Sequence, residues 1–207
     1  MARFVDHKKL GPEIRNVLQG DCVRCAVAFW GDGAAASLFV GPPPAGARII
    51  CDIAMGGTNP RELKELGARR NPGLKHLPGL HAKVYLSGSG LVVGSANASN
   101  NGIGFLDAAV LTEAGTYHHP DETAWEQAST WFDRLWKCAK PVEDAALETA
   151  AAAWGRRSAA GCVSCGRPTR RRSSTSSRRS RSDFAESASS SPPAVRPWSS
   201  GTKPPKR

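Results

Sequence analysis

The composition of the chain changes abruptly at Trp154-Gly155-Arg156-Arg157, and this break limits which part can form a core. Residues 156–207 contain 14 Ser but no Leu, Ile or Met. Such a segment cannot bury enough apolar surface to offset the conformational entropy that it would lose on ordering. We therefore predict one folded domain over residues 1–155 and a disordered basic tail, rich in Arg, Ser and Pro, over residues 156–207.

The net charge of +10 resides in the predicted tail rather than in the predicted domain. Residues 1–155 hold 15 Lys+Arg and 16 Asp+Glu, a net charge of −1, whereas residues 156–207 hold 13 and 2, a net charge of +11. The tail is either a solvated extension or a non-specific contact for nucleic acid, and the sequence leaves both open.

The chain has no run that approaches the ~20 consecutive apolar residues of a membrane span, so we do not expect an integral membrane protein. Its first six residues lack the apolar stretch of a secretory signal, which favours a cytoplasmic location. In that compartment the six Cys residues are expected to stay reduced.

Helix and strand signals alternate through the predicted domain without an internal repeat. Asn59-Pro60 is typical of a helix start, with Asn as the cap and Pro at the first helical position. The alternation predicts an α/β (α+β) domain with a mixed β-sheet. The expected strands are residues 25–30, 48–53, 81–86, 91–94 and 106–112, and the expected helices are residues 12–18, 60–66, 125–139 and 142–154.

A predicted hairpin carries most of the residues that could do chemistry. Ser87-Gly88-Ser89-Gly90 is typical of a turn between two strands. In the first strand, side chains alternate between faces, so His81, Lys83 and Tyr85 are expected on one face and the apolar residues between them in the core.

The second strand of this hairpin is expected to bring Ser95 and Asn97 to one side of the sheet near His81. An imidazole, an ammonium, a hydroxyl and a carboxamide would then converge. Phosphate chemistry needs this combination, because it requires a group that titrates near neutral pH and donors for the non-bridging oxygens.

The stretch from His81 to Asn97 resembles the phospholipase D superfamily, whose signature is His-x-Lys, four residues, Asp, and then Gly-Ser-x-Asn. His81 and Lys83 match the first part, and Gly94-Ser95-Ala96-Asn97 matches the last part. Gly88 stands where the family has Asp. The resemblance implies that His, Lys and Asn contact the phosphate and that the missing Asp is mainly structural. Less specifically, it extends over residues 11–140.

The resemblance also implies a carboxylate that orients the histidine. Asp107, ten residues after Asn97, stands at about the family position, and Glu113 is the alternative. A second His-x-Lys pair, His7-Lys8-Lys9, has no hairpin or Gly-Ser-x-Asn after it, and we interpret it as a chance match. The alternative to a phospholipase D-like domain is a generic α/β domain with a surface histidine.

One copy of the motif is present, whereas family active sites use two. The resemblance therefore implies a homodimer whose two-fold axis passes through one shared site. One His81 would form a phosphohistidine, the other would act as general acid, and no metal or other cofactor would be needed.

The predicted function is a metal-independent phosphodiesterase, foremost a nuclease on DNA or RNA. A phospholipid phosphodiesterase or phosphatidyltransferase and a catalytically dead nucleic-acid-binding module are the alternatives.

Two Cys-x-x-Cys pairs begin at Cys22 and Cys162. Because one such pair supplies half of the ligands of a closed zinc site, we do not expect zinc. Cys25 opens an apolar strand and is expected in the core. His118-His119 follows no metal-ligand spacing and is expected on a loop.

Overall fold

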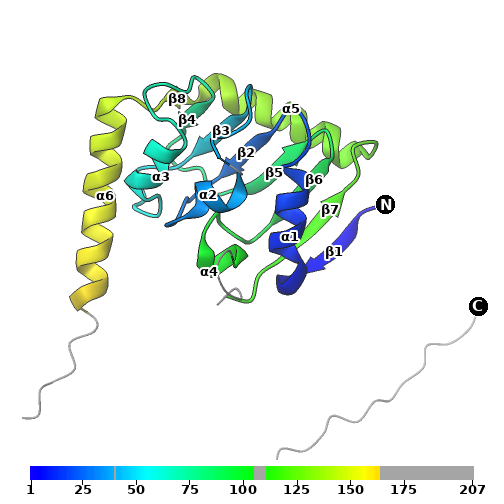
Figure 1. Cartoon of the computed structure of the whole chain (residues 1–207), viewed down its shortest axis with the longest axis horizontal. Coiled ribbons are helices and arrows are strands. Elements are labelled where there is room, and N and C mark those ends of the chain that lie inside the picture. Colours follow the sequence, from blue (N-terminus) through cyan, green and yellow to red (C-terminus); the bar gives the residue numbers. More distant parts are fainter. Residues whose placement is uncertain (40, 105–110, 164–207) are drawn as a thin grey trace, which may run out of the picture. The chain divides into compact units, whose positions relative to one another are not determined.

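The computed structural model describes residues 1–39, 41–104 and 111–163. Within them lies a mixed sheet of eight strands in the order β1-β7-β6-β5-β2-β3-β4-β8, flanked by helices (Figure 1). This confirms the predicted fold class. The strands are β1 (Arg3–Asp6), β2 (Arg24–Val27), β3 (Arg48–Cys51), β4 (Leu74–His76), β5 (Lys83–Ser87), β6 (Gly90–Gly94), β7 (Ala114–His118) and β8 (Lys140–Pro141). The helices are α1 (His7–Val17), α2 (Ala34–Leu38), α3 (Pro60–Glu65), α4 (Asn100–Ile103), α5 (Thr123–Cys138) and α6 (Asp144–Val163).

The centre of the sheet is built from the strands that the sequence predicts best. Strand β3 runs parallel to its neighbours β2 and β4, while β5 is antiparallel to both β2 and β6. Strands β5 and β6 form the predicted hairpin, with Ser87 paired to Gly90 across the turn. Helix α3 starts as predicted, since the Asn59 side chain accepts a hydrogen bond from the Arg61 backbone N–H at 3.0 Å.

Helices cover both faces of the sheet. Helix α5 packs Phe132 against one face and anchors there through an ion pair of 2.8 Å between Asp133 and Arg48 of β3. On the other face, α1, α2 and α6 close a second apolar cluster. Tyr85 lies in that cluster and is 1% exposed, so it is part of the core and not accessible beside His81. The residue faces the side expected for it, but helices cover that side.

The strand predicted over residues 106–112 lies mostly outside the described part of the chain, and its two described residues, Leu111 and Thr112, are not in a strand. The next strand, β7, was not predicted and spans Ala114–His118, between β6 and the edge strand β1. Gly115 allows this close pairing, because a Cβ atom there would lie 2.8 Å from the Val93 carbonyl oxygen. His118 is thus the last residue of a strand and not part of a loop.

The first helix begins five residues earlier than predicted. The Asp6 carboxylate caps it by accepting hydrogen bonds from the backbone N–H groups of Lys8 (3.0 Å) and Lys9 (3.1 Å). His7-Lys8-Lys9 is therefore the first turn of α1, which has neither the strand nor the hairpin that the signature requires.

The last helix runs past its predicted end at Trp154 and reaches Val163. Its Ala146, Ala150 and Ala153 are buried, so small side chains let α6 lie close to the rest of the domain. Residue 155, the predicted end of the domain, is therefore inside a helix. The predicted disorder of the tail concerns residues that, from 164 onward, lie outside the described part. Among the described helices, none has both the length and the apolar character needed to cross a bilayer.

Candidate active site

His81 and Lys83 lie together at the start of β5. The Lys83 ammonium donates a hydrogen bond to the His81 carbonyl oxygen at 2.8 Å and lies 3.4 Å from each ring nitrogen of His81. Alternation along the strand places both side chains on one face. His81 is exposed, whereas Lys83 is 9% exposed.

Burial lowers the pKa of Lys83 below the ordinary lysine value, because desolvation disfavours the ammonium. The Glu113 carboxylate acts in the opposite direction and raises this pKa. A cation with little water around it interacts strongly with any anion that reaches it. The site therefore presents a partly desolvated positive charge beside an accessible imidazole.

Phe29 connects this pair to the neighbouring strand. The antiparallel register of β2 and β5 pairs Val27 with Lys83, and the Ala28 backbone N–H continues it by donating to the Ala82 carbonyl at 2.8 Å. The next pair in this register is Phe29 and His81. Their rings make an edge contact, with centroids 5.8 Å apart.

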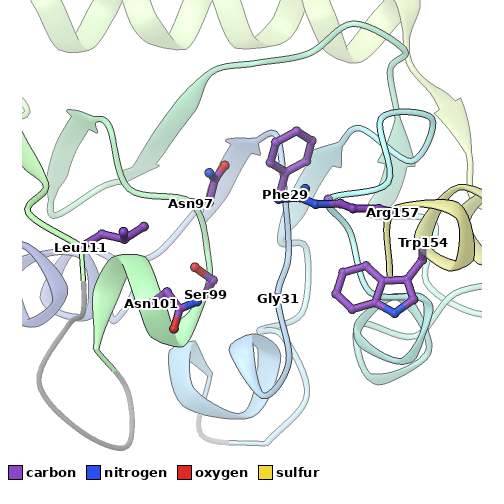
Figure 2. A pocket seen from close by; sticks show the side chains of 9 residues that line it. Phe29, Gly31, Asn97, Ser99, Asn101, Leu111, Trp154 and Arg157 are labelled. Atoms are coloured by element: carbon purple, nitrogen blue, oxygen red, sulfur yellow. The ribbon is translucent and has the colours of Figure 1, made fainter. Parts of the chain in front are cut away.

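Asn97 reaches the same region from the segment that follows β6. Trp30 and Ala98 form a parallel bridge, and both are fully buried. Because side chains alternate in extended segments, the residues on either side of this bridge face the opposite way, into a cavity of about 410 Å³. Figure 2 shows this cavity, which is lined by Phe29, Gly31, Gly57, Asn97, Ser99, Asn101, Leu111, Trp154 and Arg157.

The Asn97 side chain retains hydrogen-bonding capacity. Its Oδ1 atom is buried and has no hydrogen-bond partner among the described residues. A buried polar atom without a partner is uncommon in folded proteins and costs free energy. Asn97 also lines the cavity, and the Nδ2 end of its amide is the end that can donate a hydrogen bond to an anion.

Tyr85 holds the backbone next to Asn97. Its hydroxyl donates a hydrogen bond to the Ala96 carbonyl oxygen at 3.1 Å. Burial raises the pKa of Tyr85 well above the ordinary tyrosine value, so the hydroxyl stays protonated and can donate. Tyr85 thus fixes the segment that carries Asn97 from inside the core.

Ser95 and Glu113 form a second polar pair. The Ser95 hydroxyl donates to the Glu113 carboxylate and accepts from the Ala114 backbone N–H at 3.1 Å. These bonds attach the segment after β6 to the start of β7 and bring the Glu113 charge close enough to act on Lys83. Of the two carboxylates considered from the sequence, Glu113 is placed here, whereas Asp107 lies outside the described residues.

Gly88, at the position of the missing motif Asp, lies in the turn at the other end of β5. It is roughly 20 Å from His81 along an extended strand. A Cβ atom on Gly88 would lie 1.9 Å from Asp21 Oδ1, and the Gly88 N–H donates to the Asp21 carbonyl at 2.9 Å. Another carboxylate thus occupies the space beside this turn, and the difference from the signature is remote from the candidate reacting groups.

Asp52 stabilises the backbone next to the candidate site and was not predicted from the sequence as a site residue. It is fully buried and accepts backbone hydrogen bonds from Ala54 (2.8 Å), Met55 (2.7 Å) and Gly79 (2.7 Å). Gly79 stands two residues before His81. Asp52 therefore ties the loop after β3 to the segment that leads into His81. The only sequence signal was an acidic residue within an apolar run.

The cysteines do not form a metal site in the described part of the chain. Cys25 is buried in the core, as expected, while Cys22 is exposed. Burial raises the pKa of the Cys25 thiol. Cys162 belongs to α6, Cys165 lies outside the described residues, and no group of three His, Cys, Asp or Glu side chains that could hold a metal occurs among those described.

Comparison with known proteins identifies the fold. No family model and no curated protein sequence matches the chain. Two solved structures that match are NucT from Helicobacter pylori and Nuc from Salmonella typhimurium, a phospholipase D family member. NucT is 15% identical with a TM-score of 0.56, and the match covers 68% of this chain and 98% of NucT. Nuc is 10% identical with a TM-score of 0.50, and the match covers 70% of this chain and 99% of Nuc. The chain shares the fold of Nuc, a phospholipase D family member, as the sequence resemblance implied.

Proposed function

We propose that this protein is a metal-independent phosphodiesterase that hydrolyses phosphodiester bonds in nucleic acid. The observation that carries the proposal is the Lys83 ammonium held 3.4 Å from the His81 ring nitrogens, with the His81 ring against Phe29, which lines the same cavity as Asn97. The imidazole can act as nucleophile, and the Lys83 ammonium and the Nδ2 group of Asn97 can donate hydrogen bonds to the two non-bridging oxygens of a diester.

The proposed reaction has two steps and uses two copies of His81. A ring nitrogen of one His81 attacks phosphorus, the bond to the leaving oxygen breaks, and the second His81 protonates that oxygen. A water molecule then gives a proton to the second histidine and attacks the phosphohistidine, which releases the phosphate product and the free imidazole. Lys83 and Asn97 stabilise the negative charge in both steps.

One chain contains one such histidine, so the second comes from another copy. A two-fold axis through the site would place the two imidazoles opposite each other, since contacts across such an axis are reciprocal. The exposure of His81 is compatible with this arrangement. A homodimer with one shared site is therefore part of the proposal.

Ser95 and Glu113 have a positioning role in this proposal. Their hydrogen bond connects the Asn97 segment to β7, and the Glu113 charge favours the protonated form of Lys83. Asp107 stays the alternative carboxylate for orienting His81.

Nucleic acid is the proposed substrate because the cavity combines aromatic and cationic side chains, and because residues 156–207 carry a net charge of +11. Bases stack on aromatic rings, and phosphates attract basic residues. A cytoplasmic location, expected from the sequence, stays part of the proposal.

Cleavage in EDTA tests the function. Plasmid DNA, RNA and phosphatidylcholine vesicles are each incubated with the full-length protein and with His81→Ala. We expect cleavage of DNA or RNA by the wild-type protein and none by the variant. Cleavage of lipid alone would make the protein a phospholipid phosphodiesterase, and nucleic-acid binding without cleavage would make it a binding module.

A further inference from the structure

Helix α6 contributes two side chains to the wall of the cavity that holds Asn97. Trp154 and Arg157 stand three residues apart, and this spacing puts both on one side of the helix. Figure 2 shows them extending from α6 toward the cavity, with Asn97 on its other side. Both lie at or beyond the break in composition.

Phe29 links these residues to the candidate catalytic pair. The Arg157 guanidinium carbon lies 5.9 Å from the centroid of the Phe29 ring, and the His81 ring centroid lies 5.8 Å from it. One aromatic ring therefore contacts both the imidazole and the guanidinium. A molecule that fills the cavity would contact the Phe29 ring, which His81 contacts in turn.

Two consecutive glycines hold this arrangement in place. A Cβ atom on Gly56 would lie 2.6 Å from the Ala153 carbonyl oxygen of α6, and Gly56 also has a φ of 74°. A Cβ atom on Gly57 would lie 2.4 Å from the Phe29 ring. Glycine at both positions lets this loop run between α6 and Phe29, which fixes the helix at the edge of the cavity.

We propose that Trp154, Arg157 and Phe29 form a subsite for one unpaired nucleotide next to the scissile phosphate. This inference rests on the proposed phosphodiesterase function. The planar guanidinium of Arg157 can bind the phosphate on one side of that nucleotide with two parallel hydrogen bonds. The indole of Trp154 offers a flat apolar surface on which a base can stack.

The size and lining of the cavity favour a single unpaired base. Its volume of about 410 Å³ is within the range of pockets that hold one small molecule, about 300–1,000 Å³. Ser99 and Asn101 add polar groups that can meet the edge of a base. A base in a duplex is stacked on both faces and paired along its edge, so it cannot reach the indole without leaving the helix. The subsite therefore selects single strands.

The test measures kcat and KM of the full-length protein in EDTA on three 12-residue substrates. These are a single-stranded DNA oligonucleotide, the same oligonucleotide as a duplex, and a single strand with abasic units throughout. The variants are Trp154→Ala, Trp154→Phe and Arg157→Ala. Arg156→Ala is the matched control, because it removes the same charge from the adjacent exposed residue, which does not line the cavity.

We expect Trp154→Ala to lower kcat/KM for the single strand by about 5- to 150-fold, the range for loss of one stacked base. It should change kcat/KM for the abasic strand by less than about twofold and abolish the preference for single strand over duplex. Trp154→Phe should retain most of the activity on the single strand and most of that preference. Arg157→Ala should raise KM for all single strands. It should also reduce the slope of log KM against log salt concentration by the amount expected for the loss of about one phosphate contact. Arg156→Ala should change KM by less than about twofold.

Equal effects of Trp154→Ala on the normal and abasic strands would overturn the subsite, and so would equal effects of the two arginine variants. If Trp154→Ala does not fold, Trp154→Phe and the exposed Arg157 still decide the outcome. The proposed function fails separately, when the wild-type protein cleaves none of the substrates or when His81→Ala cleaves them equally well.

Discussion

The Lys83 ammonium lies equally close, at 3.4 Å, to both ring nitrogens of His81, and it is anchored by the His81 carbonyl oxygen at 2.8 Å. The lysine thus stays over the imidazole whichever ring nitrogen carries the proton. In the proposed reaction, this fixed cation would stabilise the negative charge that develops on the attacked phosphate.

Replacing Lys83 by Met tests this role of the ammonium. Methionine keeps most of the buried volume without the charge, so the free energy of unfolding should change by less than about 1.5 kcal/mol. Cleavage should fall by about 10²–10³-fold, the usual cost of losing one charge-stabilising donor. Thermal unfolding and kcat are measured on the same samples. Retained cleavage would show that the ammonium is not needed.

The most alkaline step in the pH dependence of cleavage should report Lys83, because loss of the His81 general acid is a separate step. Burial lowers the pKa of Lys83 and Glu113 raises it, so this most alkaline step should lie at a pH below the ordinary lysine pKa. Glu113→Gln removes the raising influence, and the alkaline decline should therefore move to lower pH. Glu126→Gln, at an exposed position on α5, is the matched control and should leave the profile unchanged. A shift to higher pH in Glu113→Gln would contradict this account.

The Asp52 carboxylate should be needed for stability and for the placement of His81. Asp52→Asn replaces one of its two accepting oxygens by a donor, so the backbone N–H groups of residues 54, 55 and 79 cannot all be satisfied. We expect unfolding to become easier by about 1–3 kcal/mol and kcat to decrease. Chemical denaturation measures the first effect. Asp133→Asn, which breaks a half-exposed ion pair, should cost less than about 1 kcal/mol.

Restoring the signature Asp should harm this protein. In Gly88→Asp the new side chain would meet the Asp21 carboxylate, which lies 1.9 Å from the Cβ position. Because Asp21 and Gly88 are exposed and the Asp21 carboxylate can rotate away, the cost should be below about 1 kcal/mol, with no rise in kcat. The double variant Gly88→Asp with Asp21→Gly should recover most of the loss, because the two residues compete for one space. An additive effect of the two substitutions would mean that they are independent.

Local patterns were enough to predict the centre of the site. The hairpin turn and the alternation of His81 and Lys83 depend on neighbours in the sequence, so they could be recognised without tertiary contacts. Strand β7 was not predicted, because Ala-Gly-Thr-Tyr-His has no apolar run. It is a strand because β1 and β6 pair with it on both sides.

The outer parts of the site depend on contacts between distant segments. Asp52 meets the Gly79 N–H only after the loops after β3 and before β5 come together. Arg157 reaches Phe29 because α6 continues through the break in composition, where an Ala-rich sequence followed by Arg has no clear stop signal. Both features depend on tertiary contacts, which the local sequence does not reveal.

In the proposed enzyme, two His81 side chains from two subunits form one active site, and a subunit-mixing experiment tests this directly. Wild-type and His81→Ala chains are mixed at different ratios, refolded together, and assayed for specific activity, with subunit exchange verified by tag pull-down. With random assortment of equal amounts, activity should fall to about a quarter, the fraction of dimers with two wild-type chains. A linear decline to about one half would mean that each subunit works alone and would contradict the shared site.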